Sequence, residues 1–308
     1  MSSFDAAVIG SGPAGVTAAL YLVRSGCSVI LFEKMAAGGQ ILQTEALENY
    51  PGYPKGIKGY ELADLFAAHL EGLPVTHSRD AVESVSGEAG NFVVQAGDKE
   101  HSCRTVIVCS GAHHRELGLA DEKRLQGRGV SYCALCDGNF FRNAPVAVVG
   151  GGNAALEESL YLAKLASKVY LIHRRDEFRG AKIYQDKLES MPDKVELVRS
   201  SVVTALHGEN ALTSLSVRDL KTDEIRQISV EGLFIYVGFE PATAYLPAAL
   251  ERDAQGFIVT DTEMRTSIPG IFAAGDVRSK LCRQVITAAG DGATAAQAAF
   301  VFLEQLHV

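Results

Sequence analysis

The sequence of 308 residues predicts an α/β protein with two Rossmann-like, three-layer nucleotide-binding domains, the second inserted in the first. A short apolar strand, a glycine-rich turn and an apolar helix occur near the N-terminus and recur 140 residues later, from Gly10 to Gly150. A late apolar run ending in Gly275-Asp276 resembles a strand that returns to the first sheet. We therefore expect one domain from residues 1–113 with 242–308 and an inserted domain from residues 114–241.

The composition restricts the location and the partners. The 47% hydrophobic content suits a sizeable core, and the net charge of −8 leaves no basic surface for nucleic acid. Residues 1–5 lack the basic stretch of a secretory signal. No apolar run approaches the roughly 18 residues of a membrane span, because Asp291 and Gln297 interrupt the alanine-rich C-terminal stretch. The simplest interpretation is a cytoplasmic protein that contacts no membrane.

The first nucleotide-binding unit has a strand at residues 6–9, a helix at residues 16–25 and a second strand at residues 29–32. Its glycines permit a tight turn and let a pyrophosphate approach the helix N-terminus. Glu33, at the end of the second strand, can accept hydrogen bonds from ribose hydroxyls. The turn consists of Gly10, Ser11, Gly12, Pro13, Ala14 and Gly15.

A long segment punctuated by glycine and proline follows, over residues 35–59, and a loop of this length is usually functional. A helix is predicted over residues 60–70. Short alternating runs near residues 82–85, 92–95 and 105–109 then predict a small antiparallel layer that returns to the main sheet. The adjacent His113 and His114 receive no role.

Two cysteines two residues apart, Cys133 and Cys136, can close a small disulfide ring and suit dithiol–disulfide exchange. Asp137 follows directly and can serve as proton donor and acceptor, because exchange must deliver a proton to the leaving thiolate. The alternative is half of a zinc site, which usually needs a second Cys/His pair. The other cysteines are scattered singly, at positions 27, 103, 109 and 282.

The second unit repeats the first, with a strand at residues 146–149, a helix at residues 157–166 and a strand at residues 169–172. Glu33 of the first unit corresponds to His173 here, and arginines follow. A carboxylate favours a free ribose 2′-hydroxyl, whereas guanidinium groups bind a 2′-phosphate; the alternative for the arginines is a solvated charge run. The turn is Gly150, Gly151, Gly152, Asn153, Ala154 and Ala155, and the cluster is His173, Arg174, Arg175 and Arg179.

Short β-like runs fill residues 195–237, and residues 238–241 form a linker. Residues 256–259 lead to a predicted strand at residues 271–277. Residues 283–285 then open an apolar segment and a last helix that ends near Gln305.

Over essentially its whole length, the chain resembles the low-molecular-weight, bacterial-type thioredoxin reductases of the FAD/NADPH pyridine nucleotide-disulfide oxidoreductase family. The resemblance implies FAD in the first domain, NADPH in the second and the redox disulfide on the NADPH domain. It also implies a homodimer and a thioredoxin or thioredoxin-like protein as substrate. The matching segments are residues 10–15, 38–40, 133–137, 150–155, 173–179 and 275–276.

The family's roles carry over by position. Electrons pass from NADPH through FAD to the disulfide and then to thioredoxin, with Cys133, Cys136 and Asp137 as catalytic residues. Cys136 is favoured to face the flavin, and Arg128 corresponds to a position that helps hold thioredoxin. The inserted domain is expected to rotate about connections near residues 110–117 and 238–243. The expected FAD contacts beyond the turn are Glu33, Lys34, Gly38, Gly39, Gln40, Asn49, Gly275, Asp276, Arg283, Gln284 and Val285.

Four positions depart from the family pattern, namely Cys109, Ser110, Ala242 and Cys282. Both cysteines are interpreted as small buried hydrophobes. Rival functions are a ferredoxin-dependent reductase, which would lack the arginine cluster, and a flavin-dependent dithiol oxidase, which would discard the NADPH site. A third rival is a flavin-holding redox sensor or binding module. The intact second turn, with Arg174 and Arg175, disfavours the first two. The third leaves Asp137 and the complete second nucleotide site unexplained.

Overall fold

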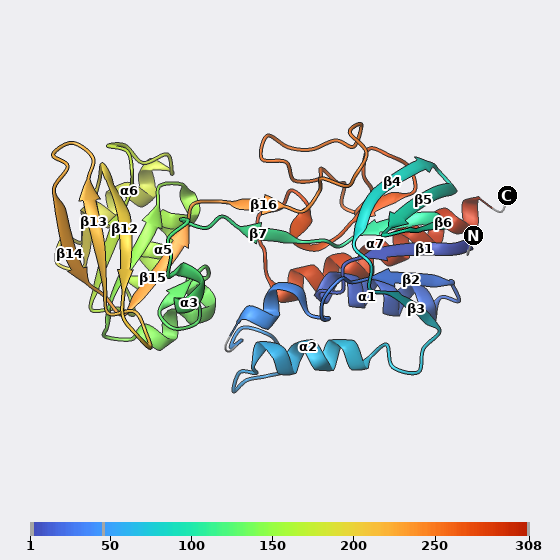
Figure 1. The fold of residues 1–308 in the computed structure, drawn as a ribbon, viewed down its shortest axis with the longest axis horizontal. Helices are drawn as coiled ribbons and strands as arrows, with labels where there is room; N and C mark the ends of the chain where they lie inside the picture. Colours follow the sequence, from blue (N-terminus) through green and yellow to red (C-terminus); the bar gives the residue numbers. More distant parts are fainter. Residues whose placement is uncertain (1–2, 45–46, 307–308) are drawn as a thin grey trace. The chain divides into compact units, whose positions relative to one another are not determined.

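The computed structural model describes residues 3–44 and 47–306. The chain forms two compact units (Figure 1): unit 1 comprises Met1–His113 and Glu240–Val308, and unit 2 comprises His114–Phe239. The predicted α/β fold with an inserted unit is confirmed. The inserted unit ends at Phe239, whereas the sequence placed its end at residue 241. Residues 45 and 46 of the predicted long loop lie outside the described part.

The sheet of unit 1 has a parallel core in the order β3-β2-β1-β6, and β17 pairs with the other side of β6. Alternate residues of β1 point to opposite faces, so Ala6 and Val8 enter one core while Ala7 and Ile9 enter the other. The strands are β1 Ser3–Ile9, β2 Val29–Phe32, β3 Val75–Ser78, β6 Lys99–Val108 and β17 Ile271–Ala273.

The predicted antiparallel layer of unit 1 is present. Strands β4 (Val82–Glu88) and β5 (Asn91–Ala96) pair antiparallel, and β5 continues antiparallel onto β6. The run predicted as a strand to residue 277 stops at Ala273, because Gly275 turns the chain at φ +79° into the short 3-10 helix η3 (Gly275–Val277). Residues 256–259 form only isolated bridges.

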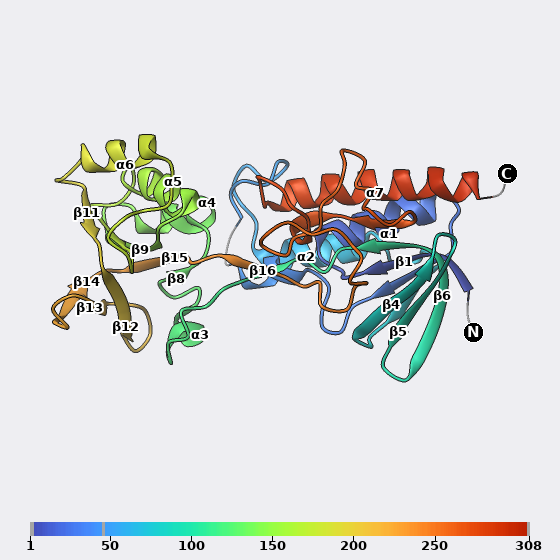
Figure 2. The same ribbon diagram turned by 90° about the horizontal axis from the view of Figure 1, so that it is seen from above.

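Two helices of unit 1 pack along each other, α1 (Pro13–Arg24) and α7 (Val285–Gln305) (Figure 2). Their contact uses small side chains, and Ala295 and Ala299 are fully buried in it. Helix α7 is long and apolar enough to cross a membrane, by length and composition only. One face of it is buried against α1, through small side chains. Unit 1 also contains η1 (Gly39–Gln43) and α2 (Gly59–Ala68).

Unit 2 contains a second parallel sheet in the order β11-β10-β9-β15-β8. Helices cover one face of this sheet and a separate antiparallel sheet covers the other, which gives three layers. The parallel strands are β8 Val130–Ser131, β9 Pro145–Gly150, β10 Lys168–Ile172, β11 Val195–Val198 and β15 Gly232–Tyr236. The helices are α3 Glu122–Leu125, α4 Ala134–Asp137, η2 Gly138–Phe141, α5 Asn153–Leu162 and α6 Lys182–Glu189, and the antiparallel strands are β12 Ser201–His207, β13 Ser214–Asp219 and β14 Ile225–Ser229.

The chain passes between the units twice, and the sequence predicted irregular connections at both places. In the structure, β7 (Ala112–His114) and β16 (Phe239–Pro241) pair as a two-stranded ribbon at these crossovers. A glycine lies just outside each strand, Gly111 and Gly238, and both have positive φ. The expected breaks in regular structure therefore lie next to the ribbon.

The α1–α7 contact generates a stability prediction. A side chain at Gly292 would overlap the backbone carbonyl of Ala14, whereas one at Gly290 of the same helix would meet nothing within 4 Å. We expect Gly292→Ala to lower the free energy of unfolding of this unit by about 1–3 kcal/mol, as overpacking does. Gly290→Ala is the matched control and should be neutral or slightly stabilising. Urea unfolding measures both, and equal stability of the two variants would contradict the contact.

Candidate functional site

Unit 1 contains a cavity of about 510 Å³ at the glycine-rich turn. The cavity brings together many of the predicted FAD residues, from four separated parts of the chain. Those on its wall are Gly10, Gly12, Pro13, Ala14, Glu33, Lys34, Gly39, Gln40, Gly275 and Asp276. Further wall residues had no predicted role, and among them are Met35, Leu42, Asp80, Cys109, His113, Tyr245 and Ala288.

In the turn, the strand end and the helix start pack closely enough for the backbone to contact a dinucleotide. Gly10 has φ +103°, and a Cβ there would lie 2.5 Å from the Cys109 carbonyl oxygen. A Cβ at Gly15 would overlap the Gly10 carbonyl, so helix α1 begins directly against the strand end. This close approach presents the helix N-terminus to the cavity, where a pyrophosphate is favoured.

Two carboxylates of this cavity differ in their partners. Glu33 accepts hydrogen bonds from the Ser11 amide (3.0 Å) and hydroxyl (3.1 Å), and from the Met35 amide (3.0 Å). The Oδ1 atom of Asp276 is buried, and within the described residues it has no hydrogen-bond partner. Burial raises the pKa of the Asp276 carboxyl above its ordinary value. An unpaired buried oxygen on a cavity wall suits a hydroxyl-bearing ligand such as FAD.

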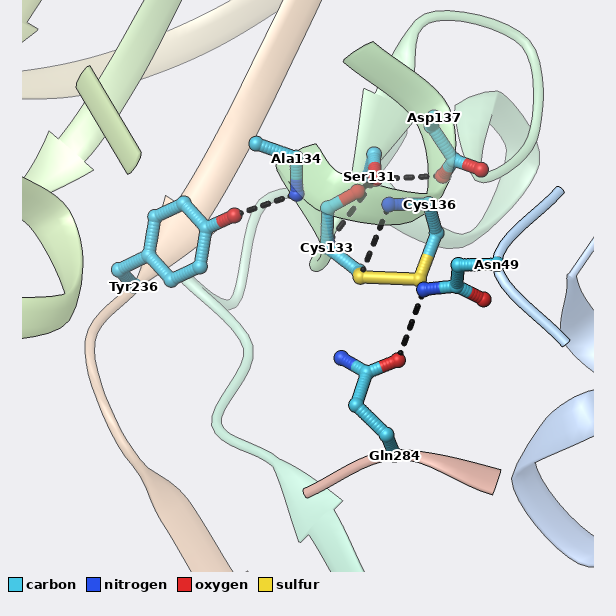
Figure 3. The surroundings of a disulfide bond; sticks show 8 residues. All are labelled: Asn49, Ser131, Cys133, Ala134, Cys136, Asp137, Tyr236 and Gln284. Atoms are coloured by element: carbon cyan, nitrogen blue, oxygen red, sulfur yellow. Dashed lines mark hydrogen bonds between the residues drawn. A yellow bond between two sulfur atoms is a disulfide. The ribbon is translucent and has the colours of Figure 1, made fainter. Parts of the chain in front are cut away.

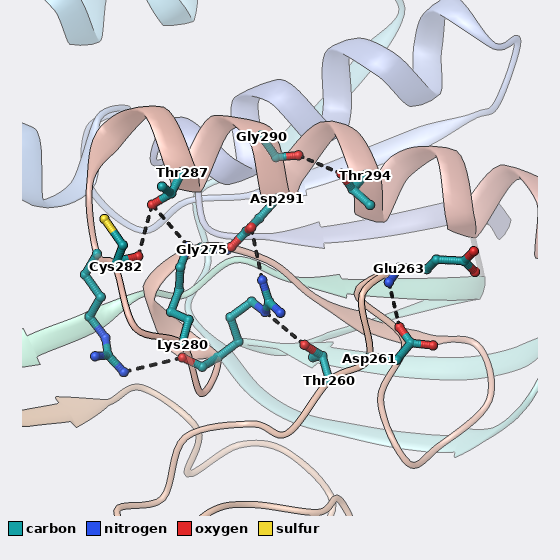
Figure 4. Close-up of polar contacts among 12 residues, drawn as sticks. Thr260, Asp261, Glu263, Gly275, Lys280, Cys282, Thr287, Gly290, Asp291 and Thr294 are labelled. Carbon is teal, nitrogen blue, oxygen red and sulfur yellow. Dashed lines mark hydrogen bonds and ion pairs between the residues drawn. The ribbon is translucent and has the colours of Figure 1, made fainter.

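A buried ion-pair network holds the Gly275-Asp276 turn (Figure 4). Asp291 accepts hydrogen bonds from the Gly275 amide (3.1 Å), Lys280 Nζ (2.6 Å) and Arg278 Nη1 (3.0 Å). The Lys280 and Asp291 side chains are only 9% and 12% exposed, so solvent screens this pair weakly. The sequence analysis noted Asp291 only as an interruption of an apolar stretch. Its supporting role depends on tertiary contacts that no local pattern reveals.

Some predicted FAD residues lie away from the cavity wall. The Asn49 amide donates to the Gln284 side chain at 3.0 Å (Figure 3), and the Arg283 guanidinium lies 4.0 Å from the centroid of the Phe257 ring. Val285 is the first residue of α7. Ser11, Gly15 and Gly38 are also absent from the wall. The roles of all these residues toward FAD stay predictions.

In unit 2, Cys133 and Cys136 form a disulfide with their Cα atoms 5.3 Å apart. The two sulfur atoms are therefore bonded to each other. This favours dithiol–disulfide exchange over the alternative of a zinc site. Cys133 precedes helix α4, and its Sγ accepts a hydrogen bond from the Cys136 amide at 3.2 Å (Figure 3).

Ser131 links this disulfide to Asp137. Its hydroxyl donates to Asp137 Oδ2 at 2.6 Å and accepts from the Cys133 amide at 3.1 Å (Figure 3). Ser131 lies on β8, where it pairs in register with Phe234 of β15. The sequence assigned no role to Ser131, although its position two residues before the first cysteine could have drawn attention to it.

The glycine turn of unit 2, which is the second in the chain, packs on His173. A Cβ at Gly151 would overlap the imidazole, which is buried and stacked on Phe178 with ring centroids 5.3 Å apart. Burial lowers the pKa of His173, and the neighbouring arginines lower it further. The His173 ring, whose lowered pKa favours the neutral form, thus packs against Gly151 of the turn. Asn153, at the start of α5, accepts the Ala181 amide at 2.8 Å.

The three arginines that follow His173 are exposed, namely Arg174, Arg175 and Arg179. Within residues 3–44 and 47–306, none of them forms an ion pair, so their guanidinium groups are open to a ligand phosphate. Asp176, between them, pairs instead with Lys221 at 2.5 Å.

Cys109 and Cys282, both interpreted from the sequence as buried, differ in their exposure to solvent. Cys109 is buried on the wall of the cavity of unit 1, and burial raises the pKa of its thiol, as expected for a small hydrophobe. The expectation for Cys282 is wrong, because this residue is exposed. It lies before α7, next to the fully exposed Leu281.

Comparison with known proteins defines the class of enzyme. Residues 4–292 match the family described as pyridine nucleotide-disulphide oxidoreductase. The chain belongs to this family and is an oxidoreductase. Thioredoxin reductases of this family use FAD and NADPH as cofactors. The glycine turns and the charged residues described above are suited to bind both nucleotides.

The more specific similarity is to thioredoxin reductases. The chain is 41% identical to that of Treponema pallidum over 306 residues, covering 99% of each chain. It is 42% identical to that of Listeria innocua, covering 98% of this chain and 95% of the other. The crystal structure of the thioredoxin reductase from Streptococcus pyogenes aligns with a TM-score of 0.92 and 44% identity, covering 99% of both chains. The resemblance found in the motifs is confirmed.

The Asp291 network generates a prediction for flavin retention. Asp291→Ala leaves Lys280 buried without its carboxylate and frees the Gly275 amide, a loss of about 3–5 kcal/mol for a buried pair. We expect FAD to be released at a markedly lower temperature, measured by the rise in flavin fluorescence on heating. Glu263→Ala, which removes an exposed partner of Arg265, is the control and should leave the release temperature unchanged. Unaltered release from Asp291→Ala would show that the network does not support the flavin turn.

Proposed function

We propose that this chain reduces oxidised thioredoxin with NADPH, through FAD and the Cys133–Cys136 pair. The overall reaction converts NADPH, a proton and the thioredoxin disulfide to NADP⁺ and the thioredoxin dithiol. The observation that carries the proposal is a disulfide on the same unit as an intact second nucleotide turn, Gly150 to Gly152. The identity of over 40% to thioredoxin reductases, along nearly the whole chain, supports it.

The cavity of unit 1 supplies the flavin site. The turn at residues 10–15 would hold the pyrophosphate at the start of α1, while Glu33 would accept ribose hydroxyls. Asp276 offers its buried oxygen to a further hydroxyl. Bound FAD would supply a two-electron carrier between the nicotinamide and the protein disulfide.

The dithiol and its neighbours act on the partner. One thiolate of the reduced pair attacks a sulfur atom of the thioredoxin disulfide, and the second thiol then resolves the mixed disulfide. Each exchange releases a thiolate that needs a proton. Asp137 lies beside the pair and is oriented by Ser131, so it can store and return that proton. The family geometry favours Cys136 on the flavin side.

The rival functions explain less of the chain. A ferredoxin-dependent reductase or a dithiol oxidase has no use for the exposed Arg174 and Arg175 at the second nucleotide turn. A binding module that only held flavin would not explain the Ser131–Asp137 hydrogen bond beside the disulfide.

Several finer features remain part of the proposal. The protein is proposed to be a soluble, cytoplasmic homodimer that binds neither nucleic acid nor membrane. Unit 1 is proposed to bind FAD and unit 2 to bind NADPH, with rotation of unit 2 between half-reactions. Arg128 is proposed to help hold thioredoxin. The net charge of −8 supports the absence of nucleic acid, and the family resemblance supports the rest.

The arginine cluster predicts the choice of nucleotide. A charge-assisted contact to the 2′-phosphate contributes roughly 1.5–3 kcal/mol, about ten- to a hundredfold in affinity. Replacing Arg174 and Arg175 with alanine should therefore lower kcat/KM for NADPH by that factor and leave NADH nearly unaffected. Arg226→Ala, which removes an exposed arginine paired with Glu196, is the control. Equal losses for both nucleotides would show that the cluster does not recognise the phosphate.

The relay predicts separable half-reactions. Cys133→Ser or Cys136→Ser should abolish reduction of thioredoxin, because a single thiol cannot complete the exchange. FAD should stay bound and should still be bleached by NADPH under anaerobic conditions. The measurements are flavin absorbance and the reduction of a dithiol reporter through added thioredoxin. Full reductase activity in either variant would rule out the relay, and Cys282→Ser serves as the matched control.

A further inference from the structure

Tyr236 lies where a nucleotide is expected to bind in unit 2. It is the last residue of β15 and pairs in register with Gly150, the last residue of β9. The strand order places β10 on one side of β9 and β15 on the other. In an open parallel sheet, ligands bind in the crevice at the carboxyl ends of strands where the order reverses in this way. Tyr236 therefore lies at the edge of the crevice that the second glycine turn enters.

The backbone of Tyr236 is packed tightly against that turn. A Cβ at Gly150 would lie 2.6 Å from the Tyr236 carbonyl oxygen and 3.2 Å from its Cβ. There is consequently no space in which the turn could shift toward β15 without moving Tyr236. A pyrophosphate that fixes the turn would also fix the end of this strand.

The hydroxyl of Tyr236 reaches the redox pair from the same strand end. It accepts a hydrogen bond from the Ala134 amide at 2.6 Å (Figure 3). Ala134 is fully buried and is the first residue of helix α4, directly after Cys133. A buried amide that loses its acceptor is costly, so this bond constrains the turn that carries both cysteines.

The surroundings keep this phenol neutral. Burial, with the charges of Glu158 and Asp137, raises the pKa of Tyr236 well above its ordinary value. Glu158 lies on α5, the helix that follows the second glycine turn, and Asp137 lies on α4 beside the disulfide. The hydroxyl is thus within electrostatic reach of one carboxylate from each of the two sites. It remains a hydrogen-bonding group throughout the working pH range.

We propose that Tyr236 is a positioning residue that couples occupation of the second nucleotide turn to the redox equilibrium of Cys133 and Cys136. This inference rests on the proposed function in one respect, that the turn binds NADPH and NADP⁺. A bound nucleotide holds the turn, the strand end and the hydroxyl, and the hydroxyl holds the Ala134 amide. The cysteine turn is then kept in the geometry that brings the two Cα atoms within 5.3 Å.

The sign of the coupling follows from this geometry. Disulfide formation requires two close, correctly directed cysteines, whereas the separated thiols have no such requirement. Fixing the turn therefore favours the disulfide over the dithiol. A bound nucleotide makes the dithiol a stronger reductant, which favours electron delivery to the partner. By linkage, the nucleotide binds the disulfide form more tightly than the dithiol form by the same factor.

The test measures the redox equilibrium of the pair itself in the FAD-loaded protein. Dithiothreitol buffers of known composition supply two electrons and two protons to the disulfide, and dithiothreitol becomes its cyclic disulfide. Alkylation and mass mapping of the peptide containing Cys133 and Cys136 then give the dithiol fraction, with and without saturating NADP⁺. We expect NADP⁺ to lower the dithiol-to-disulfide ratio at fixed buffer potential by about fivefold or more, the usual size of such couplings.

Tyr236→Phe retains the ring and the backbone contact with Gly150 but lacks the hydroxyl. In this variant the response to NADP⁺ should fall below about twofold, under the range of ordinary couplings. Tyr170→Phe is the matched control, because Tyr170 lies on β10 of the same sheet and packs against the opposite core. It should retain the wild-type response.

A second measurement needs no variant. The Kd for 2′-phospho-ADP-ribose, which has the pyrophosphate and the 2′-phosphate but no nicotinamide to accept electrons, should differ by the same factor between the fully oxidised and the dithiothreitol-reduced protein and favour the oxidised form, as measured by calorimetry. The inference is overturned by a wild-type pair that does not respond to NADP⁺, or by a full response in Tyr236→Phe. Failure to reduce thioredoxin, with the Tyr236-dependent response intact, would refute the proposed function and leave this coupling standing.

Discussion

The close approach of a helix start to a strand end is the constraint on which both units depend. In unit 1, Gly15 touches the Gly10 carbonyl so closely that any side chain would overlap it. In unit 2, Ala155 stands at the corresponding position, and its Cβ would lie 2.7 Å from a Cβ at Gly150. A side chain is also excluded there at Gly151, by the ring of His173. The two turns thus exclude a side chain at different positions, at Gly15 because of the backbone and at Gly151 because of a buried imidazole. In both units a helix begins directly after the glycine turn, and a helix N-terminus is where a pyrophosphate is favoured.

The two units diverge at the end of the second strand. Glu33 is held by Ser11 and Met35 at the edge of its cavity, which places a negative charge where a ribose would lie. The corresponding His173 is buried, and the charge of unit 2 is carried by the exposed Arg174 and Arg175. The same fold therefore carries a negative charge at this position in one unit and positive charges in the other, which supports the proposed choice of a free 2′-hydroxyl in unit 1 and a 2′-phosphate in unit 2. The difference requires few residues because the backbone framework is shared.

The sequence predicted the features that local signals encode. Glycine spacing and alternating apolar runs placed both sheets, and the two cysteines were found by their spacing. It could not find Asp291 or Tyr236, since each acts on residues far away in the chain, at Gly275 and at Ala134. Cys282 was misassigned because composition does not show where a loop is left uncovered. The crossovers were expected to be irregular, but their strands pair with each other across 120 residues and more, a contact with no local pattern.

The redox pair and the second nucleotide turn share one sheet, and this has a mechanical consequence. Ser131 lies on β8 and Tyr236 on β15, and β15 pairs with both β8 and β9. The disulfide is therefore held on one side by Ser131 and on the other by Tyr236, whose own position depends on the glycine turn of β9. Parallel strands that end at the same edge bring these groups together without a dedicated loop. A change at the nucleotide turn can thus reach the cysteines through two adjacent strands within one unit.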